Sequence, residues 1–411
     1  MNTGLRYLIL LCTSLVATQV IATDMSGWSD KTVCRLVKSG GLQEHIDEAA
    51  ARGMSCETPV VVKKPSSAVT ESPTTIATPK TPLRPLHDLL DQRYIENHMI
   101  AFDLGHSAQA VCNTGSAATF LAYIDADNTK WAILLQGGGA VGSDQDYINR
   151  ESNLKNSMLV DRKQRSGPID ENNILGSLNR RNYNIVVLPY CSSDAHGGNH
   201  MRRIKGERVA FKGRKIVEAL VEQLSPYIKP SDELLVGGFS AGGAGTGYNI
   251  DLFSTIESQR TRYVFDSNWV TQDEVDYTSG GRGEWKDYLK YMIETPPNGG
   301  CKAGNPEPCS ATLARLQEYG SDGAFIAYNS SEWRSVKSSS KFEVTIKREI
   351  KAAGGGISVS EKYGTNDWSD VGAHVILFAG DAYNKTTLGL TPRVVFEAWL
   401  DDKKGGTYID L

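Results

Sequence analysis

The chain has 411 residues, of which 22% are charged and 40% hydrophobic, and its formal net charge at pH 7 is −4. This near balance gives no electrostatic basis for binding nucleic acid or an anionic membrane surface, so we expect neither as a partner. The length allows one large domain with smaller additions.

Residues 1–22 have the features of a secretory signal peptide. Arg6 precedes an apolar run from Leu8 to Val16, and Val20-Ile21-Ala22 has the small-x-small form found before a cleavage site. The apolar run is shorter than the ~20 residues that a membrane span needs, and no later segment approaches that length. We predict an exported protein, secreted or periplasmic, without a membrane span.

The cysteines indicate disulfides. One of the seven, Cys12, lies in the signal peptide, and an even number remains for an exported chain. We predict one pair close in sequence, Cys301 with Cys309, and another in the N-terminal region, Cys34 with Cys56. Cys112 and Cys191 are then left as partners of each other or as free thiols.

Three regions follow the signal peptide. Residues 23–57 predict two short helices separated by Gly40-Gly41, with the second ended by Gly53, and the Cys34–Cys56 clip would tie them together. We interpret this module as having no chemistry, with a binding or anchoring role as the alternative. Residues 58–85 are rich in Pro, Thr and Ser and predict a linker. Residues 86–411 form the predicted catalytic domain.

The catalytic domain reads as alternating strands and helices, which predicts an α/β fold with a mostly parallel sheet flanked by helices. The predicted strands are Thr119 to Ile124, Trp131 to Leu135, Asn184 to Leu188, Glu233 to Phe239, Arg262 to Phe265, Ala324 to Tyr328 and Ile357 to Tyr363. The predicted helices are Gly206 to Leu224, Ala241 to Ile256, Glu284 to Ile293, Ala311 to Tyr319, Lys341 to Ala353 and Pro392 to Asp401.

The centre of this domain is the pentapeptide Gly238-Phe239-Ser240-Ala241-Gly242. It stands between a predicted strand and a predicted helix, the context in which a G-x-S-x-G serine forms a nucleophile elbow. A glycine-rich turn that cradles phosphate is the alternative, but neither Gly-Lys-Ser/Thr nor a G-x-G-x-x-G fingerprint is present. Ser240 is therefore the candidate nucleophile.

A second glycine-rich loop, Gln136-Gly137-Gly138-Gly139, follows the strand Trp131 to Leu135. In hydrolases of this architecture such a loop supplies part of the oxyanion hole, and the residue after the nucleophile supplies the rest. We predict the backbone N–H groups of Gly138, Gly139 and Ala241 as the donors.

Two polar segments are expected at the same edge of the sheet. Asp194 lies in the segment after the strand Asn184 to Leu188. We predict that it either binds substrate or forms a turn. Trp269 follows the strand Arg262 to Phe265 and is the candidate wall of an acyl or sugar pocket.

The order of catalytic residues in this fold is serine, acid, histidine. Only one of the seven histidines, His374, follows Ser240 in the chain, so we predict it as the base. The acid should follow the strand Ala324 to Tyr328, where Glu332 is the carboxylate.

These pieces together resemble the pectin acetylesterase and Notum family of serine carboxylesterases. The resemblance is carried by WAILLQGGG, LPYCSSDAHGG, GGFSAGGAGTGYNID, FDSNW and the His374 segment, and extends over most of residues 105 to 400. It implies an α/β-hydrolase-like fold and ester hydrolysis by a Ser-acid-His triad. The chain has Gly139 where the family commonly has Trp, Asn268 where it has Gly, and Glu332 in the region of the triad aspartate.

We predict a serine carboxylesterase that removes acyl groups, such as acetyl, from a polysaccharide. The alternatives are a lipid-type esterase acting on an acylated protein, as in Notum, and a catalytically silent carbohydrate-binding or scaffold protein of the same fold. No cofactor is implied, and no H-E-x-x-H pattern or close Cys/His pairing indicates a metal. The sequence does not indicate an oligomeric state.

Overall fold

The computed structural model describes twelve stretches of the chain: residues 50–53, 97–105, 107–153, 167–269, 291, 312–329, 340–354, 356–359, 375–379, 383–384, 390–402 and 409–410. The chain divides into two units, Met1–Thr70 and Glu71–Leu411, which we describe separately. In the first unit the described residues are the end of a helix. Gly53 has φ 68° and donates its N–H to the Ala50 carbonyl at 3.0 Å, which closes the last turn.

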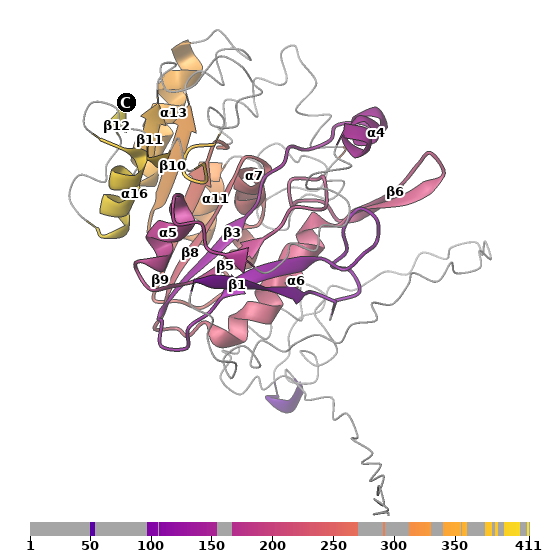
Figure 1. Cartoon of the computed structure of the whole chain (residues 1–411), viewed down its shortest axis with the longest axis horizontal. Coiled ribbons are helices and arrows are strands. Elements are labelled where there is room, and N and C mark those ends of the chain that lie inside the picture. Colours follow the sequence, from indigo (N-terminus) through magenta and orange to yellow (C-terminus); the bar gives the residue numbers. More distant parts are fainter. Residues whose placement is uncertain are drawn as a thin grey trace, which may run out of the picture. The chain divides into compact units, whose positions relative to one another are not determined.

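The second unit is organised around a ten-stranded sheet (Figure 1). In spatial order its strands are β12 (Ile409–Asp410), β11 (Gly356–Val359), β10 (Ala324–Asn329), β9 (Arg260–Asp266), β8 (Glu233–Phe239), β3 (Lys130–Leu135), β5 (Tyr183–Leu188), β2 (Thr119–Tyr123), β1 (His98–Asp103) and β4 (Gly167–Pro168). All pairs from β12 to β5 are parallel, and β2, β1 and β4 extend the sheet in antiparallel pairs.

Helices cover both faces of this sheet, because its strands alternate their side chains between two cores. In β3, Trp131, Ile133 and Leu135 belong to one core, whereas Ala132 and Leu134 belong to the other. The first core is closed by residues of α6 (Gly213–Leu224), α8 (Ile250–Phe253), α11 (Thr312–Tyr319) and α13 (Ser340–Ala353). The second core is closed by residues of α5 (Ile174–Asn179) and α16 (Pro392–Leu400). This three-layer arrangement confirms the predicted α/β fold class.

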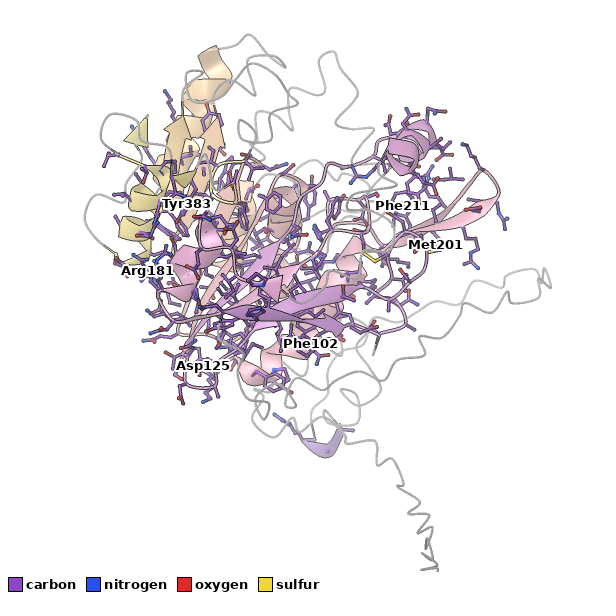
Figure 2. The ribbon with its side chains drawn as sticks, viewed as in Figure 1. Phe102, Asp125, Arg181, Met201, Phe211 and Tyr383 are labelled. Atoms are coloured by element: carbon purple, nitrogen blue, oxygen red, sulfur yellow. A yellow bond between two sulfur atoms is a disulfide. The ribbon has the colours of Figure 1, made fainter. Side chains whose placement is uncertain are left out.

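A two-stranded hairpin, β6 (His200–Ile204) with β7 (Glu207–Phe211), extends away from the main sheet beside α4 (Asp144–Asn153) (Figure 1). A separate small core joins them: Tyr147 of α4 packs against Phe211 of β7 with ring centroids 5.8 Å apart. On the outer side of the hairpin Met201 is 38% exposed (Figure 2). Over the described residues, no helix has both the length and the apolar character that crossing a bilayer requires.

Cys112 and Cys191 form a disulfide, drawn in yellow in Figure 2. It joins residues 79 apart in sequence and ties the segment before β2 to the loop after β5. Of the two possibilities that the sequence left for these cysteines, pairing is therefore confirmed. Cys34, Cys56, Cys301 and Cys309 lie outside the described residues.

Two predicted helices differ from those observed. The predicted helix Gly206 to Leu224 is strand β7 followed by α6, since Val209, Ala210 and Phe211 are held in the hairpin by pairing with β6. The predicted helix Ala241 to Ile256 is divided into α7 (Ala241–Tyr248) and α8 at Asn249. The side-chain amide of Asn249 donates to the Gly245 carbonyl one turn back and to the His196 carbonyl, and its oxygen accepts from Arg214.

Candidate active site

Strand, turn and helix meet at Ser240 as the G-x-S-x-G context predicts. β8 ends at Phe239, α7 begins at Ala241, and Ser240 between them has φ 51° and ψ −125°. Its backbone N–H is held by the Asp266 carbonyl of the neighbouring strand at 2.8 Å. The positive φ turns the serine out of the strand direction, as a nucleophile elbow requires.

Glycines allow this turn to form against β3. A Cβ built on Gly242 would lie 2.0 Å from the Leu135 carbonyl oxygen, and one on Gly238 would lie 2.4 Å from the Gly242 carbonyl oxygen. Both overlaps are with backbone, which cannot rotate away. Only glycine therefore permits the first turn of α7 to approach β3 so closely.

The Gln136–Gly139 loop lies directly beside the candidate nucleophile. A Cβ on Gly137 would be 2.7 Å from the Ser240 Cβ, and Gly138 and Gly139 have φ of 153° and 75°. Ala241, the third predicted donor, is the first residue of α7, where helix N–H groups have no partner within the helix. The structure thus places the loop that carries Gly138 and Gly139 beside Ser240 and the start of α7.

The side chain of His196 contacts the Gln136–Gly139 loop. Its Nε2 lies 2.9 Å from the Gln136 carbonyl oxygen, and because a carbonyl only accepts, Nε2 carries the hydrogen. Its Nδ1 is buried without a hydrogen-bond partner, so the ring is neutral. Burial lowers the pKa of His196 to about 4.

Asp194, predicted as a substrate-binding residue or turn former, is fully buried within its own loop. Its carboxylate accepts hydrogen bonds from the Ser192 hydroxyl at 2.5 Å and from the Gly213 N–H at 2.8 Å. Burial raises its pKa to about 6 although these bonds favour the charged form. The carboxylate therefore orders the loop after β5, and we assign it to turn formation.

Trp269 follows β9, as predicted, but its side chain is enclosed. It is 2% exposed, packs edge-on against Phe265 at 5.0 Å, and donates its indole N–H to the Glu349 carboxylate at 2.7 Å. A side chain enclosed in this way belongs to the core between the sheet and α13. It does not offer the open wall that a pocket needs.

Asp266, at the end of β9, is a buried carboxylate that the sequence did not single out. It accepts backbone N–H groups from Ile376 at 3.0 Å, Leu377 at 2.7 Å and Phe378 at 3.2 Å. Burial raises its pKa to about 6, and these hydrogen bonds oppose the rise. Asp266 therefore anchors the segment 375–379, which begins one residue after His374, to the strand beside Ser240.

His374 and Glu332, the predicted base and acid, lie outside the described residues. Sequence reasoning also missed His196, Asp266 and Arg150. His196 precedes Ser240 in the chain, so the expected triad order gives it no role. Asp266 stands in the FDSNW segment, where only the tryptophan is a candidate from sequence, and Arg150 has no motif around it. Among the described residues, no group of three His, Cys, Asp or Glu side chains is placed to hold a metal ion.

Comparisons with known proteins find relatives among carboxylesterases. The family model described as Pectinacetylesterase matches residues 92–294. The palmitoleoyl-protein carboxylesterase notum2 of Xenopus laevis is 27% identical over 257 residues, which cover 58% of this chain and 49% of that protein. The palmitoleoyl-protein carboxylesterase NOTUM of Mus musculus is 29% identical over 180 residues, covering 41% and 35%. The chain thus spans half or less of the length of these relatives.

A solved structure supports the fold. The structure of the Wnt deacylase Notum from Drosophila superposes with a TM-score of 0.55 at 18% identity, covering 74% of this chain and 93% of that chain. At this identity the likeness concerns the fold, and it confirms the α/β-hydrolase-like architecture. The resemblance seen in the sequence motifs is confirmed by the family model and the curated relatives together.

Proposed function

Because the chain carries a pectinacetylesterase-family domain and resembles the Notum carboxylesterases, we propose that it is a serine carboxylesterase with Ser240 as nucleophile. One observation carries the proposal. Ser240 stands at φ 51° between β8 and α7, so close to Gly137 that a Cβ on that glycine would overlap the Ser240 Cβ. A turn of this kind presents Oγ at the sheet edge beside a loop that can supply N–H donors.

The proposed reaction gives each of the candidate residues a role. Ser240 Oγ attacks the ester carbonyl carbon while His374 takes its proton, and the carbonyl oxygen becomes an oxyanion bound by the N–H groups of Gly138, Gly139 and Ala241. The C–O bond to the alcohol then breaks, and the alcohol leaves with the proton from His374. Water attacks the acyl-serine by the same route in reverse and releases the carboxylic acid.

A carboxylate is needed to orient His374 and to stabilise the imidazolium. Asp266 is unsuited to that role, because its Oδ2 already accepts three backbone N–H groups and its Oδ1 accepts from Ile376 and Ser267. Glu332 remains our candidate. It follows β10, the strand next to β9, which is the position expected of a triad acid.

We propose O-acetyl groups on a polysaccharide as the substrate. The name of the matching family model, Pectinacetylesterase, supports this choice. A second candidate, a fatty acyl ester on a protein, is favoured by the names of the curated relatives, which are palmitoleoyl-protein carboxylesterases. A charged side chain beside the oxyanion loop, Arg150, favours the short acyl group, since a fatty chain would leave that charge in apolar surroundings.

Labelling with a fluorophosphonate probe tests the nucleophile. We expect the wild-type protein and the control variant Ser258→Ala to label, and Ser240→Ala to remain unlabelled and inactive with an unchanged melting temperature. Labelling of Ser240→Ala would show that another residue is the nucleophile. Absence of labelling in the folded wild-type protein would favour the catalytically silent scaffold.

A panel of p-nitrophenyl esters tests the acyl group. Acetyl and propionyl esters should be hydrolysed with a higher kcat/KM than octanoyl and longer esters. The opposite order would favour a lipid-type substrate. Release of acetate from an acetylated polysaccharide then tests the polysaccharide assignment directly.

We further propose that the protein is exported after removal of residues 1–22 and that residues 23–57 and 58–85 are a helical module and a linker. The Cys112–Cys191 disulfide supports export, because such bonds persist in oxidising compartments. Mass spectrometry of the mature N-terminus tests the cleavage. Release of residues 23–85 by mild proteolysis, with esterase activity retained, tests the division.

A further inference from the structure

A partly buried cation lies beside the candidate oxyanion loop, with two of its three nitrogen atoms enclosed and without a hydrogen-bond partner. Arg150 is on α4, the helix that follows this loop. Its Nε and Nη2 are buried and have no hydrogen-bond partner. Among the described residues, no carboxylate forms an ion pair with it. Burying N–H groups of a charged side chain without acceptors is unfavourable, so such an arrangement calls for an explanation.

The neighbours of the guanidinium hold it in place without neutralising it. Its Cζ lies 5.6 Å from the centroid of the Tyr190 ring, a cation–π contact. Asp194 attracts it electrostatically, but that carboxylate is already bonded to Ser192 and Gly213. Burial lowers the pKa of Arg150, although a guanidinium starts so high that it stays charged.

Gly139 makes room for this cation. A Cβ on Gly139 would lie 3.0 Å from Arg150 Nη1, and the φ of 75° at this glycine disfavours any other residue. The guanidinium therefore lies against Gly139, one of the two loop residues proposed as oxyanion donors. The tryptophan common at this place in the family would compete with it for the same space.

We propose that Arg150 stabilises, through its charge, the oxyanion that forms on the substrate carbonyl at Gly138 and Gly139. The inference rests on the proposed esterase activity. Nε and Nη2 of the cation have no hydrogen-bond partner in the resting protein, and the cation gains a negative neighbour when the carbonyl oxygen becomes an oxyanion. An interaction that strengthens only as charge develops lowers the barrier without tightening substrate binding.

The test compares Arg150→Met, which removes the charge and keeps the stem, with Arg150→Lys, which keeps the charge. Arg203→Met, on the exposed hairpin, is the control for loss of one surface cation. With neutral p-nitrophenyl acetate, kcat of Arg150→Met should fall by between about tenfold and a hundredfold, with KM within about twofold. Arg150→Lys should recover most of the loss, and Arg203→Met should match the wild type.

A second measurement uses phenylboronic acid, which adds to an activated serine. The Oγ–B bond forms, the hydroxyl proton passes to the histidine, and boron becomes tetrahedral and negative. The dissociation constant of Arg150→Met for this compound should rise by about the same factor as its kcat falls. The melting temperature of this variant should be unchanged or higher, because a side chain with buried N–H groups that lack acceptors has been replaced by an apolar one.

Three outcomes would overturn the inference. One is an unchanged kcat and boronate affinity in Arg150→Met. Another is a loss confined to KM for substrates that carry a carboxylate, which would make Arg150 a substrate-binding residue. The third is a lower melting temperature in Arg150→Met that explains the loss. If the wild-type protein neither hydrolyses the ester nor binds the boronate, it is the proposed function that fails.

Discussion

The two sides of the candidate site are built by different means. On the nucleophile side, Ser240 and the Gln136–Gly139 loop follow adjacent parallel strands, β8 and β3, and the contacts between them are made by backbone at glycine positions. On the other side, the side chain of Asp266 holds the N–H groups of residues 376–378, about a quarter of the chain away in sequence.

The difference shows which parts of an active site can be recognised from the sequence. Close backbone approach requires glycine, so the nucleophile side carries a visible pattern of small residues. A buried carboxylate that binds backbone N–H groups looks in the sequence like any other aspartate. We expect substitutions on the nucleophile side to destabilise the protein by steric overlap. Substitutions on the opposite side should destabilise it by removing hydrogen bonds.

The largest effect should come from the acid. Replacing Glu332 by Gln removes the charge that stabilises the imidazolium, so kcat should fall by about 10³- to 10⁴-fold with KM little changed. Steady-state kinetics on a short-chain ester measure both, with Glu207→Gln on the hairpin as control. A loss of less than about tenfold would transfer the role to Asp367 or Asp370, or to a Ser-His dyad.

Steric overlap on the nucleophile side is tested by two glycines of the same helix. Gly242→Ala places a Cβ 2.0 Å from the Leu135 carbonyl oxygen, whereas Gly247→Ala meets the Thr312 hydroxyl at 3.2 Å. The first should lower the free energy of unfolding by about 3 kcal/mol. The second should be near neutral, since alanine favours helix by about 1 kcal/mol. Equal denaturant midpoints for the two variants would contradict the tight packing described at Gly242.

The opposite side is tested by Asp266→Asn, which retains one acceptor and places an N–H donor among backbone donors. The free energy of unfolding should fall by about 2 kcal/mol, and kcat should fall at least tenfold, roughly, because the segment next to His374 loses its anchor. Asp322→Asn, which loses one exposed bond to the Thr261 N–H, is the control. Should the Asp266 variant keep full kcat, the anchor would be irrelevant to catalysis.

The smallest effect concerns pH. The folded pKa of His196, about 4, is below its ordinary value, so the unfolded chain binds a proton first and this contribution to stability is lost as pH falls from about 6.5 toward 4. Between pH 7 and pH 5, the wild-type protein should lose about 2 kcal/mol relative to His196→Gln.

Asp194 and Asp266 titrate in the opposite direction, because their folded pKa values, about 6, are raised. Each loses stability as pH rises from about 4 toward 6, but both are present in the wild type and in His196→Gln and cancel in the difference. Denaturant titrations at the two pH values supply the comparison. A pH-independent difference would mean that His196 is not buried as a neutral ring.

Most of the sheet was predictable because its parallel strands are buried on both faces and appear as apolar runs. The predicted strands from Thr119 to Tyr328 all occur, with small shifts at their ends. The hairpin of β6 and β7 was missed because its strands are short, charged and partly exposed, as in His200–Ile204. Its apolar positions also fit a helical pattern that continues into α6.

In the site, Ser240 and the glycine loops were predictable because their chemistry is local. Trp269 was misplaced because a polar segment at a strand end does not reveal whether its aromatic residue points to solvent or under a helix such as α13. Arg150 and Asp266 could not be predicted, since their significance depends on which backbone groups other loop segments bring to them.

The backbone of Ser240 has φ 51° and ψ −125°. At this position the residue that gives the most stable fold and the residue that gives activity are therefore different. Glycine adopts such a conformation without strain, whereas a residue with a Cβ destabilises the fold by roughly 1–3 kcal/mol. A library sorted for thermal resistance alone should therefore enrich Ser240→Gly, a more robust protein with no nucleophile. A descendant of this chain released from its reaction would be expected to drift the same way, so glycine at this position would mark lost activity.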